Sequence, residues 1–515
     1  MTRKVLLTLF VLSFAFNLGV AAMQPSPGYM DAAYYFSGAA RLAGGEGFTE
    51  VVLWNYLSDP QGLPQPSHGY WMPLTSVVAA IGIRLLPFVA PLRVAQGVMA
   101  LVAAASVVVT ALLAQRLTGD AGQARLAGIF ALLAGFYAPF LPAVDAFGLY
   151  MLLGGLFLLA VAWLAGRGGP GWIVLGALAG LCTLARADGL LWLAVVGLAA
   201  LWLAAPAGGR ARLGAVGWVA LGFILAAGPW LVRNEMLFGT PLSPGGGRAL
   251  WLLNYDELFI YPASQLTLER WLAAGPSVWL ANWGAALGAN LQTALVVHGL
   301  ILLGPLAVWG GWSLRDEQPA VKVGALAYAF TFLAMTLVFP FAGARGGFFH
   351  SGAAVMPLVY AVVPVGLARL AGAYTAWRGR PARPLRTFFT ALALVLALVL
   401  NLFALNRSLV GWDSGAAQYR EVDARLVALG AGEGEIVIVN NPPAYYVETG
   451  RPAIVVPDAN VAGLAALAGR YGARWLLLDE NVPAALAGLA AQPRDVPGLR
   501  YVESFAGLHI FKVIP

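Results

Sequence analysis

Two aspartates stand out among the residues that could do chemistry. Asp31 opens a short helical pattern in which Tyr34 and Tyr35 follow at i+3 and i+4, and therefore on one face. Asp145 lies in a proline-containing turn, residues 139–147, between two apolar runs. A carboxylate in either place can accept a proton from a hydroxyl group, but Asp at the start of a helix is also a common N-cap. Both interpretations stay open for both aspartates.

Four cationic side chains could bind an anionic group. They are Arg186, Arg233, Arg345 and His350, each in a short segment between apolar runs. A guanidinium group binds phosphate oxygens through two parallel hydrogen bonds, so a lipid phosphate is a suitable ligand. The alternative is that these side chains only extend toward lipid head groups. His68, in the segment 66–71, is either a substrate-binding residue or an ordinary polar residue at the membrane surface.

The sequence lacks the motifs of several other kinds of active site. Gly44-Gly-Glu-Gly47 is not a P-loop, because no Gly-Lys-Ser or Gly-Lys-Thr follows it. The sequence has no Asp-X-Asp pair, no His and carboxylate cluster with metal-ligand spacing, and no Gly-X-Ser-X-Gly. The single cysteine, Cys182, excludes an internal disulfide. We therefore predict no cofactor; a divalent metal is possible but not indicated.

The composition indicates the class of protein. Of the 515 residues, 60% are hydrophobic and only 11% are charged, whereas soluble proteins average about 25% charged residues. The sequence therefore predicts a polytopic α-helical membrane protein. The net charge of +7 does not indicate nucleic-acid binding, because most arginines lie in short loops, where they set topology.

About eleven apolar runs are long enough to be candidate membrane spans. They are residues 4–22, 92–114, 125–142, 147–165, 171–185, 189–205, 214–232, 291–311, 321–340, 353–373 and 387–405. Arg3 and Lys4 place the N-terminus in the cytoplasm, and an odd number of spans then places the C-terminus outside. The first run could instead be a cleaved signal peptide, since Val20-Ala-Ala resembles a cleavage site. The anchor interpretation is simpler because many spans follow.

The side of the membrane on which each later loop lies depends on residues 72–88. This segment is apolar but short, and Arg84 interrupts it. A crossing there would place the arginine-rich loops outside, so we predict a helix on the outer surface. Residues 23–91 and 233–290 are then long outer loops, and the second contains an amphipathic helix over Leu266–Ala274. Asp31 and Asp145 both fall at outer ends of early spans, so we expect them to converge.

The character of the chain changes near residue 406. Glu435–Asn440 and Arg474–Asp479 read as buried strands, and Tyr419–Leu429 and Ala462–Tyr471 as helices. We therefore predict two domains, a transmembrane domain over 1–405 and a small extracytoplasmic α/β domain over 406–515.

Several short segments, in their order along residues 1–370, resemble the GT-C superfamily of polyprenyl-phosphate-sugar-dependent glycosyltransferases, nearest to the RgtA/B/C/D-like and protein mannosyltransferase-like groups. They are Asp31–Phe48, Trp71–Thr75, Leu184–Gly189, Pro229–Asn234 with Phe238-Gly239, and Phe348–Ser351. The resemblance implies a GT-C-like fold, an acid in the first outer loop, carried by Asp31, and an acid in the second, carried by Asp145. The metal-using branch has an Asp-X-Asp loop, which this chain lacks.

The resulting hypothesis is a multi-pass cell-membrane glycosyltransferase. It would move a sugar from a polyprenyl-phosphate donor to a hydroxyl of a lipid, glycan or protein acceptor on the outer face, with inversion. Asp31 would be the base and Asp145 would orient it or the sugar. Arg233, Arg345 and Arg186 would hold the phosphate. The other predicted substrate-binding residues are Tyr34, Tyr35, His68 and His350. The alternatives are a lipid or sugar transporter or flippase without chemistry, and a scaffold protein; transporters usually carry repeats and midplane charges, which this sequence lacks.

Overall fold

The computed structural model describes residues 1–164, 171–204, 208–379 and 382–514. Its contacts form two compact units that alternate along the chain. Unit 1 contains Met1–Met23, Gln96–Arg233 and Trp283–Ser408, and unit 2 contains Gln24–Ala95, Asn234–Asn282 and Leu409–Pro515.

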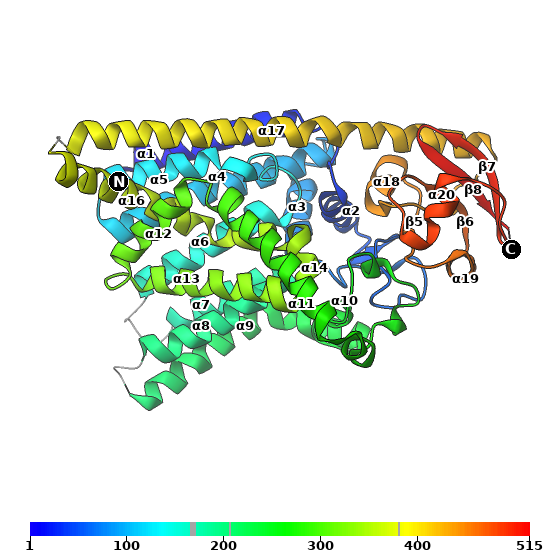
Figure 1. The fold of residues 1–515 in the computed structure, drawn as a ribbon, viewed down its shortest axis with the longest axis horizontal. Helices are drawn as coiled ribbons and strands as arrows, with labels where there is room; N and C mark the ends of the chain where they lie inside the picture. Colours follow the sequence, from blue (N-terminus) through cyan, green and yellow to red (C-terminus); the bar gives the residue numbers. More distant parts are fainter. Residues whose placement is uncertain (165–170, 205–207, 380–381, 515) are drawn as a thin grey trace. The chain divides into compact units, whose positions relative to one another are not determined.

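Unit 1 is helical. Some of its helices continue into unit 2, and the longest, α17, is a single helix of 47 residues (Figure 1). The main helices are α1 (Arg3–Ala22), α4 (Pro91–Thr118), α5 (Ala121–Leu133), α6 (Ala146–Leu164), α7 (Gly171–Ala185), α8 (Leu190–Leu203), α9 (Gly209–Phe238), α11 (Leu268–Gln292), α12 (Leu303–Leu314), α13 (Pro319–Leu333), α16 (Met356–Arg378) and α17 (Ala382–Ala428). Short helical turns lie between them: η1 (Gly135–Tyr137), η2 (Ala187–Gly189), η6 (Thr293–His298), η7 (Ala334–Val338), α14 (Pro340–Ala342), η8 (Gly343–Gly347), α15 (Phe348–Gly352) and η9 (Ala353–Val355).

The described residues contain seven helices that are long and apolar enough to cross a membrane. The pair Leu268–His298 and Leu303–Leu314, which meet at a bend of 83°, could be an eighth span. Our prediction of about eleven was therefore too high. The three remaining predicted spans correspond to α5, α7 and α8, which have only 13, 15 and 14 residues. The run 171–185 is filled by α7, and the run 125–142 continues past α5 into η1. A multi-pass helical membrane protein is confirmed.

Glycines bring the helices of unit 1 into backbone contact. A Cβ atom added to Gly154 in α6 would lie 2.0 Å from the carbonyl oxygen of Ala354, and one added to Gly222 in α9 would lie 2.0 Å from that of Ile173 in α7. Gly366 in α16 meets the Leu306 carbonyl of α12 in the same way. Small residues permit this approach, which supplies packing energy where lipid removes the hydrophobic driving force.

Two of the three stretches of unit 2 contribute strands to one mixed sheet of six strands. The order is β2-β5-β4-β6-β8-β7. Strands β2, β5, β4 and β6 are parallel to one another, and β8 pairs antiparallel with both β6 and β7. The strands are β2 (Val52–Leu53), β4 (Ile436–Ile438), β5 (Ala453–Ile454), β6 (Ala473–Leu478), β7 (Leu499–Phe505) and β8 (Leu508–Val513). The edge strand β2 comes from the loop after α1, so this loop and the C-terminal segment share one core.

The other elements of unit 2 lie in all three of its stretches. They are α2 (Met30–Gly44), β1 (Thr49–Glu50), β3 (Gln65–Pro66), α3 (Leu74–Leu85), α10 (Pro244–Ala249), η4 (Asp256–Phe259), η5 (Ala263–Gln265), α18 (Pro442–Thr449), α19 (Val461–Tyr471), η10 (Ala484–Leu486) and α20 (Ala487–Ala491). Strands β1 and β3 pair antiparallel, with Glu50 opposite Gln65.

The C-terminal predictions compare directly with these elements. The first predicted strand contains β4, the second overlaps β6 over residues 474–478, and Ala462–Tyr471 falls within α19. Tyr419–Leu429 is the end of α17 rather than a separate helix, and the predicted domain boundary at 405 falls inside α17. The predicted surface helix is α3, whose 12 residues extend about 18 Å, less than the roughly 30 Å of a hydrocarbon core.

Candidate functional site

Asp31 lies in the first turn of α2. The N-cap residue of this helix is Tyr29, so Asp31 is not the N-cap that we left open as an alternative. A carboxylate in the first turn is still stabilised by the positive end of the helix dipole. Asp31 is half-buried. Its place in the helix therefore does not require an aspartate for capping.

Tyr34, Tyr35 and His68 are buried and join α2 to the chain that follows it. The Tyr34 hydroxyl donates to Glu50 Oε2 at 2.6 Å and accepts from the backbone N–H of His68 at 2.7 Å. Burial and the Glu50 carboxylate raise the pKa of Tyr34 well above its ordinary value, so the phenol keeps its proton and donates it. Tyr34 thus holds the loop against the helix that carries Asp31.

The His68 imidazole lies between two serines. Its Nδ1 atom is 2.8 Å from Ser67 Oγ and its Nε2 atom is 3.0 Å from Ser76 Oγ, while the Ser76 hydroxyl donates to the Tyr35 carbonyl. A neutral ring protonated at Nε2 satisfies all three bonds. His68 has 0% exposure. The contacts of this residue connect α2 to α3.

Asp145 and His350 form a hydrogen-bonded pair in unit 1. Asp145 directly precedes α6, and its Oδ1 accepts from the N–H of Ala146. Its Oδ2 lies 3.1 Å from Nε2 of His350, whose Nδ1 lies 2.9 Å from the carbonyl oxygen of Gly346. The Asp145 side chain is 1% exposed and the His350 side chain 14%. The sequence identified both residues but not their contact.

Aromatic rings surround this pair. The His350 ring stacks on Phe147 with centroids 3.8 Å apart, and Phe147 also contacts Phe349 and Tyr137. The Tyr137 hydroxyl donates to the Phe349 carbonyl at 2.7 Å. These contacts fix the plane of the imidazole and reduce water access, so the electrostatic interaction between Asp145 and His350 is stronger than it would be at an exposed site.

Arg186 lies at the tip between α7 and α8 and binds a carboxylate of its own segment. Its Nε atom is 2.9 Å from Asp188 Oδ1. Asp188 Oδ2 accepts from the Tyr150 hydroxyl at 3.4 Å, and that hydroxyl accepts from Trp192 Nε1 at 3.1 Å. A Cβ atom at Gly189 would lie 2.2 Å from the Cys182 backbone, so the close packing of this tip requires glycine.

Arg233 and Arg345 differ in their surroundings. The Arg233 guanidinium lies over the Trp230 ring of the same helix, 4.2 Å from its centroid. Arg345 is exposed and belongs to the irregular turn η8, where Gly346 has a φ of +111°. The same turn supplies the carbonyl oxygen that His350 contacts. Arg345 and His350 are therefore carried by one short kinked segment.

The sequence did not point to two charged residues that take part in these contacts, Asp188 and Glu50. Asp188 lies two residues after Arg186, and this spacing could have predicted their ion pair. Glu50 carried no signal, because its partners Tyr34 and Gln65 are 16 and 15 residues away. Within unit 1, Asp145 and His350 each offer one ligand atom for a metal ion.

The structure brings Asp145 and His350 together within unit 1, and Tyr34, Tyr35 and His68 together within unit 2. Asp31 belongs to unit 2 and Asp145 to unit 1, so the convergence of the two aspartates stays a prediction. The roles that we predicted for the nine site residues also stay predictions.

Comparison with known proteins gives no match by sequence. No family model matches the chain, and no curated protein matches it. Solved structures do match by fold. ArnT from Cupriavidus metallidurans bound to undecaprenyl phosphate superposes with a TM-score of 0.59 at 13% identity, covering 99% of this chain and 98% of ArnT. The chain has the GT-C glycosyltransferase fold.

Structures of two further proteins agree with the GT-C fold. The Archaeoglobus fulgidus oligosaccharyltransferase, tethered to an acceptor peptide, gives a TM-score of 0.57 at 11% identity, covering 93% of this chain and 69% of that one. Another structure of that enzyme holds an inhibitory peptide and a dolichol-phosphate. The arabinofuranosyltransferase AftD from mycobacteria gives 0.51 at 16% identity, covering 100% of this chain and 40% of AftD. The fold predicted from the resemblance is confirmed.

Proposed function

We propose that the chain is an inverting membrane glycosyltransferase that takes a sugar from a polyprenyl phosphate. The observation that carries the proposal is the GT-C fold, shared with ArnT over 99% of this chain. That structure of ArnT contains undecaprenyl phosphate, and a structure of the Archaeoglobus enzyme contains dolichol-phosphate. A donor of this kind needs no nucleotide site, which agrees with the absence of a nucleotide-binding motif from the sequence.

In the proposed reaction, an acceptor hydroxyl attacks the anomeric carbon of the donor. The new C–O bond forms as the bond between that carbon and the phosphate oxygen breaks, so the polyprenyl phosphate leaves with the electron pair. The hydroxyl proton passes to Asp31. A single displacement inverts the anomeric configuration. Reaction takes place on the outer face of the membrane, with the N-terminus in the cytoplasm.

Asp31 is the better candidate for the base, and Asp145 for an orienting residue. Asp31 is half-buried at the start of α2, where its carboxylate is not used as the N-cap. Asp145 is 1% exposed and already shares a hydrogen bond with His350. A carboxylate in a short contact with a histidine gains less from taking another proton, because the proton between the two groups already compensates its charge.

The donor phosphate is bound by Arg345 and Arg233. Arg345 is exposed on a kinked turn, so its guanidinium can reach a ligand. Arg186 contributes less, because Asp188 at 2.9 Å already compensates its charge. Tyr34, Tyr35 and His68 act mainly by holding α2, since the side chains of Tyr34 and His68 and the backbone of Tyr35 are engaged in hydrogen bonds within unit 2.

The test is a transfer assay with the full chain in lipid nanodiscs. The donors are polyprenyl-phosphate pentoses and hexoses with a labelled sugar, and the acceptors are lipid, glycan and peptide pools. We expect release of polyprenyl phosphate and a glycoside with the opposite anomeric configuration, read by NMR. Glu46→Gln, an exposed acid that follows α2, is the matched control for variants of Asp31.

The alternative is a lipid or sugar transporter or flippase, and the same preparation distinguishes it. Movement of the labelled lipid between leaflets of proteoliposomes, with no glycoside formed from any donor and acceptor, would contradict the transferase. A product with retained configuration would contradict the single displacement.

A further inference from the structure

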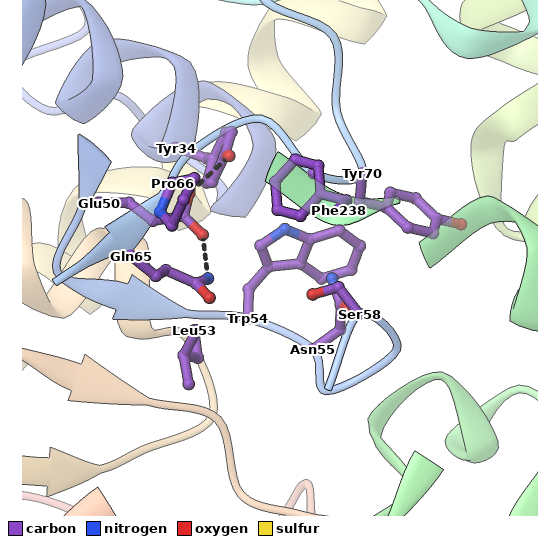
Figure 2. Close-up of a pocket in the computed structure, with 11 residues that line it drawn as sticks. Tyr34, Glu50, Leu53, Trp54, Asn55, Ser58, Gln65, Pro66, Tyr70 and Phe238 are labelled. Carbon is purple, nitrogen blue, oxygen red and sulfur yellow. Dashed lines mark hydrogen bonds between the residues drawn. The ribbon is translucent and has the colours of Figure 1, made fainter. Parts of the chain in front are cut away.

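A hollow of about 350 Å³ opens within unit 2. Asp31, the proposed base, is not among the residues that line it. It is built from the loop after α1 and the end of α9, and all of its lining residues belong to unit 2 (Figure 2). They are Tyr34, Glu50, Leu53, Trp54, Asn55, Ser58, Gln65, Pro66, Gly69, Tyr70 and Phe238. Aromatic rings, amides, a hydroxyl and one carboxylate thus converge on one small, partly open hollow.

A rigid aromatic platform forms one part of the lining. The Trp54 indole stacks on Trp71 with centroids 4.0 Å apart and planes 12° apart, and Tyr70 meets Trp54 edge-on at 4.9 Å. Tyr34 packs edge-on against Trp71 at 5.0 Å. These contacts hold the rings in one arrangement before a ligand arrives, which reduces the entropy cost of binding.

A fixed carboxylate forms another part. Glu50 Oε2 accepts from the Tyr34 hydroxyl at 2.6 Å, and its Oε1 accepts from Gln65 Nε2 at 2.5 Å. Both oxygens act as acceptors, as in an ionised carboxylate, which has further lone pairs for ligand hydroxyls. Glu50 and Gln65 face each other across β1 and β3. In Figure 2, Trp54 lies between this pair and the side chains of Asn55 and Ser58.

This combination suits the ring of a sugar. A pyranose or furanose ring has an apolar C–H face that packs on an aromatic surface, and a rim of hydroxyls that donate to carboxylate and amide oxygens. The lining residues include no lysine or arginine, so they provide no cationic partner for a uronate or a sugar phosphate. A prenyl chain in the hollow would remove solvent from the Glu50 carboxylate without supplying a hydrogen bond, which costs free energy.

We propose that the Trp54–Glu50 hollow is a carbohydrate subsite that binds a neutral or amino-sugar ring of the substrate. The inference rests on the proposed function for the identity of that substrate. The same chemistry fits a sugar of the acceptor glycan or a sugar of the donor, and the experiment separates these sources.

The first measurement is direct binding to the full chain in nanodiscs. Methyl glycosides of neutral hexoses and pentoses, of amino sugars and of uronic acids are titrated and observed by saturation-transfer NMR. We expect binding of neutral and amino sugars, at least about tenfold weaker binding of uronates, and a loss of about tenfold or more with Glu50→Gln. Tyr70→Ala is the second variant, since Tyr70 is only half-buried. Glu46→Gln and Tyr255→Ala, both outside the lining, are the matched controls.

Equal binding of neutral sugars by wild type, Glu50→Gln and Tyr70→Ala would overturn the subsite, as would equal binding of uronates or preferential binding of a peptide. The second measurement is competition during transfer. A methyl glycoside that raises KM for the acceptor assigns the hollow to the acceptor, and one that raises KM for the donor assigns it to the donor sugar. Glycoside binding without transfer would contradict the proposed function and leave the subsite standing. Transfer without glycoside binding would contradict the subsite and leave the proposed function standing.

Discussion

The Oδ2 atom of Asp145 lies 3.1 Å from Nε2 of His350, while Nδ1 of the same imidazole lies 2.9 Å from the carbonyl oxygen of Gly346. A carbonyl oxygen only accepts, so Nδ1 carries a proton. The short contact between Nε2 and Oδ2 then needs one further proton, on the imidazole or on the carboxyl group. The two side chains are therefore joined by one hydrogen bond, beside the rings of Phe147 and Phe349.

The first prediction tests this coupling. His350→Ala leaves the buried Asp145 carboxyl without its partner and should lower the free energy of unfolding by about 1–3 kcal/mol. In an Asp145→Asn background the same change should cost less, with a coupling of at least about 0.5 kcal/mol. The measurement is a double-mutant cycle of unfolding in mixed detergent micelles, and His509→Ala in unit 2 is the control. Additive effects of the Asp145 and His350 changes would contradict the hydrogen bond between them.

The second prediction concerns Asp31. Asn keeps the shape of the side chain but cannot accept the hydroxyl proton, so Asp31→Asn should lower kcat by about 10²–10⁴. Because Tyr29 is the N-cap, both Asp31→Asn and Asp31→Ala should change stability by no more than about 1 kcal/mol, the usual size of a helix-dipole effect. The assay is labelled-sugar transfer with thermal unfolding on the same preparations. Wild-type transfer by Asp31→Asn would remove Asp31 as the base and make Asp145 the leading candidate.

The third prediction separates the arginines. Arg345→Ala and Arg233→Ala should weaken donor binding by about 1.5–3 kcal/mol each, the value of a charge-assisted hydrogen bond, with KM for the acceptor unchanged. Lysine should rescue only partly, because it lacks the planar guanidinium. Arg186→Ala should instead reduce stability, since it leaves the 10% exposed Asp188 side chain without its guanidinium. Donor titrations that show no change in Arg345→Ala and Arg233→Ala would limit both residues to contacts with lipid head groups.

The fourth prediction concerns membrane orientation. In a Cys182→Ala background, single cysteines at the exposed positions Gln61 and Glu433 should react with an impermeant thiol reagent in intact cells. A cysteine at the exposed Ala121, before α5, should react only after permeabilisation. Labelling of position 121 from outside would reverse the proposed orientation and show that the chain crosses the membrane between residues 72 and 88.

The fifth prediction concerns a glycine beside a buried histidine. A Cβ atom at Gly352 would lie 2.1 Å from Nε2 of His298, whose ring packs against Phe348 and Tyr328. Gly352→Ala should therefore lower stability by about 1–3 kcal/mol through overpacking. Gly214→Ala in α9 meets nothing within 4 Å and, as a helical substitution, should be neutral or stabilising by up to about 1 kcal/mol. Equal unfolding temperatures for both variants would contradict the tight contact.

The sequence by itself determined the parts of this protein that depend on local composition. Apolar runs near the length of a bilayer predicted the long helices, because each run must bury its backbone polar groups in its own hydrogen bonds. Short runs rich in β-branched and aliphatic residues predicted β4 and β6. The GT-C fold was predicted from the resemblance of short segments, such as Asp31–Phe48 and Phe348–Ser351, to that superfamily.

Tertiary structure decided what depends on distant partners. Strand β2 has two residues and pairs with β5 some 400 positions later, so no local periodicity could reveal it. His350 meets Asp145 from 205 residues away. Glu50 becomes a fixed acceptor only because Tyr34 and Gln65 converge on it. These contacts arise from the packing of separate elements, which local sequence patterns do not encode.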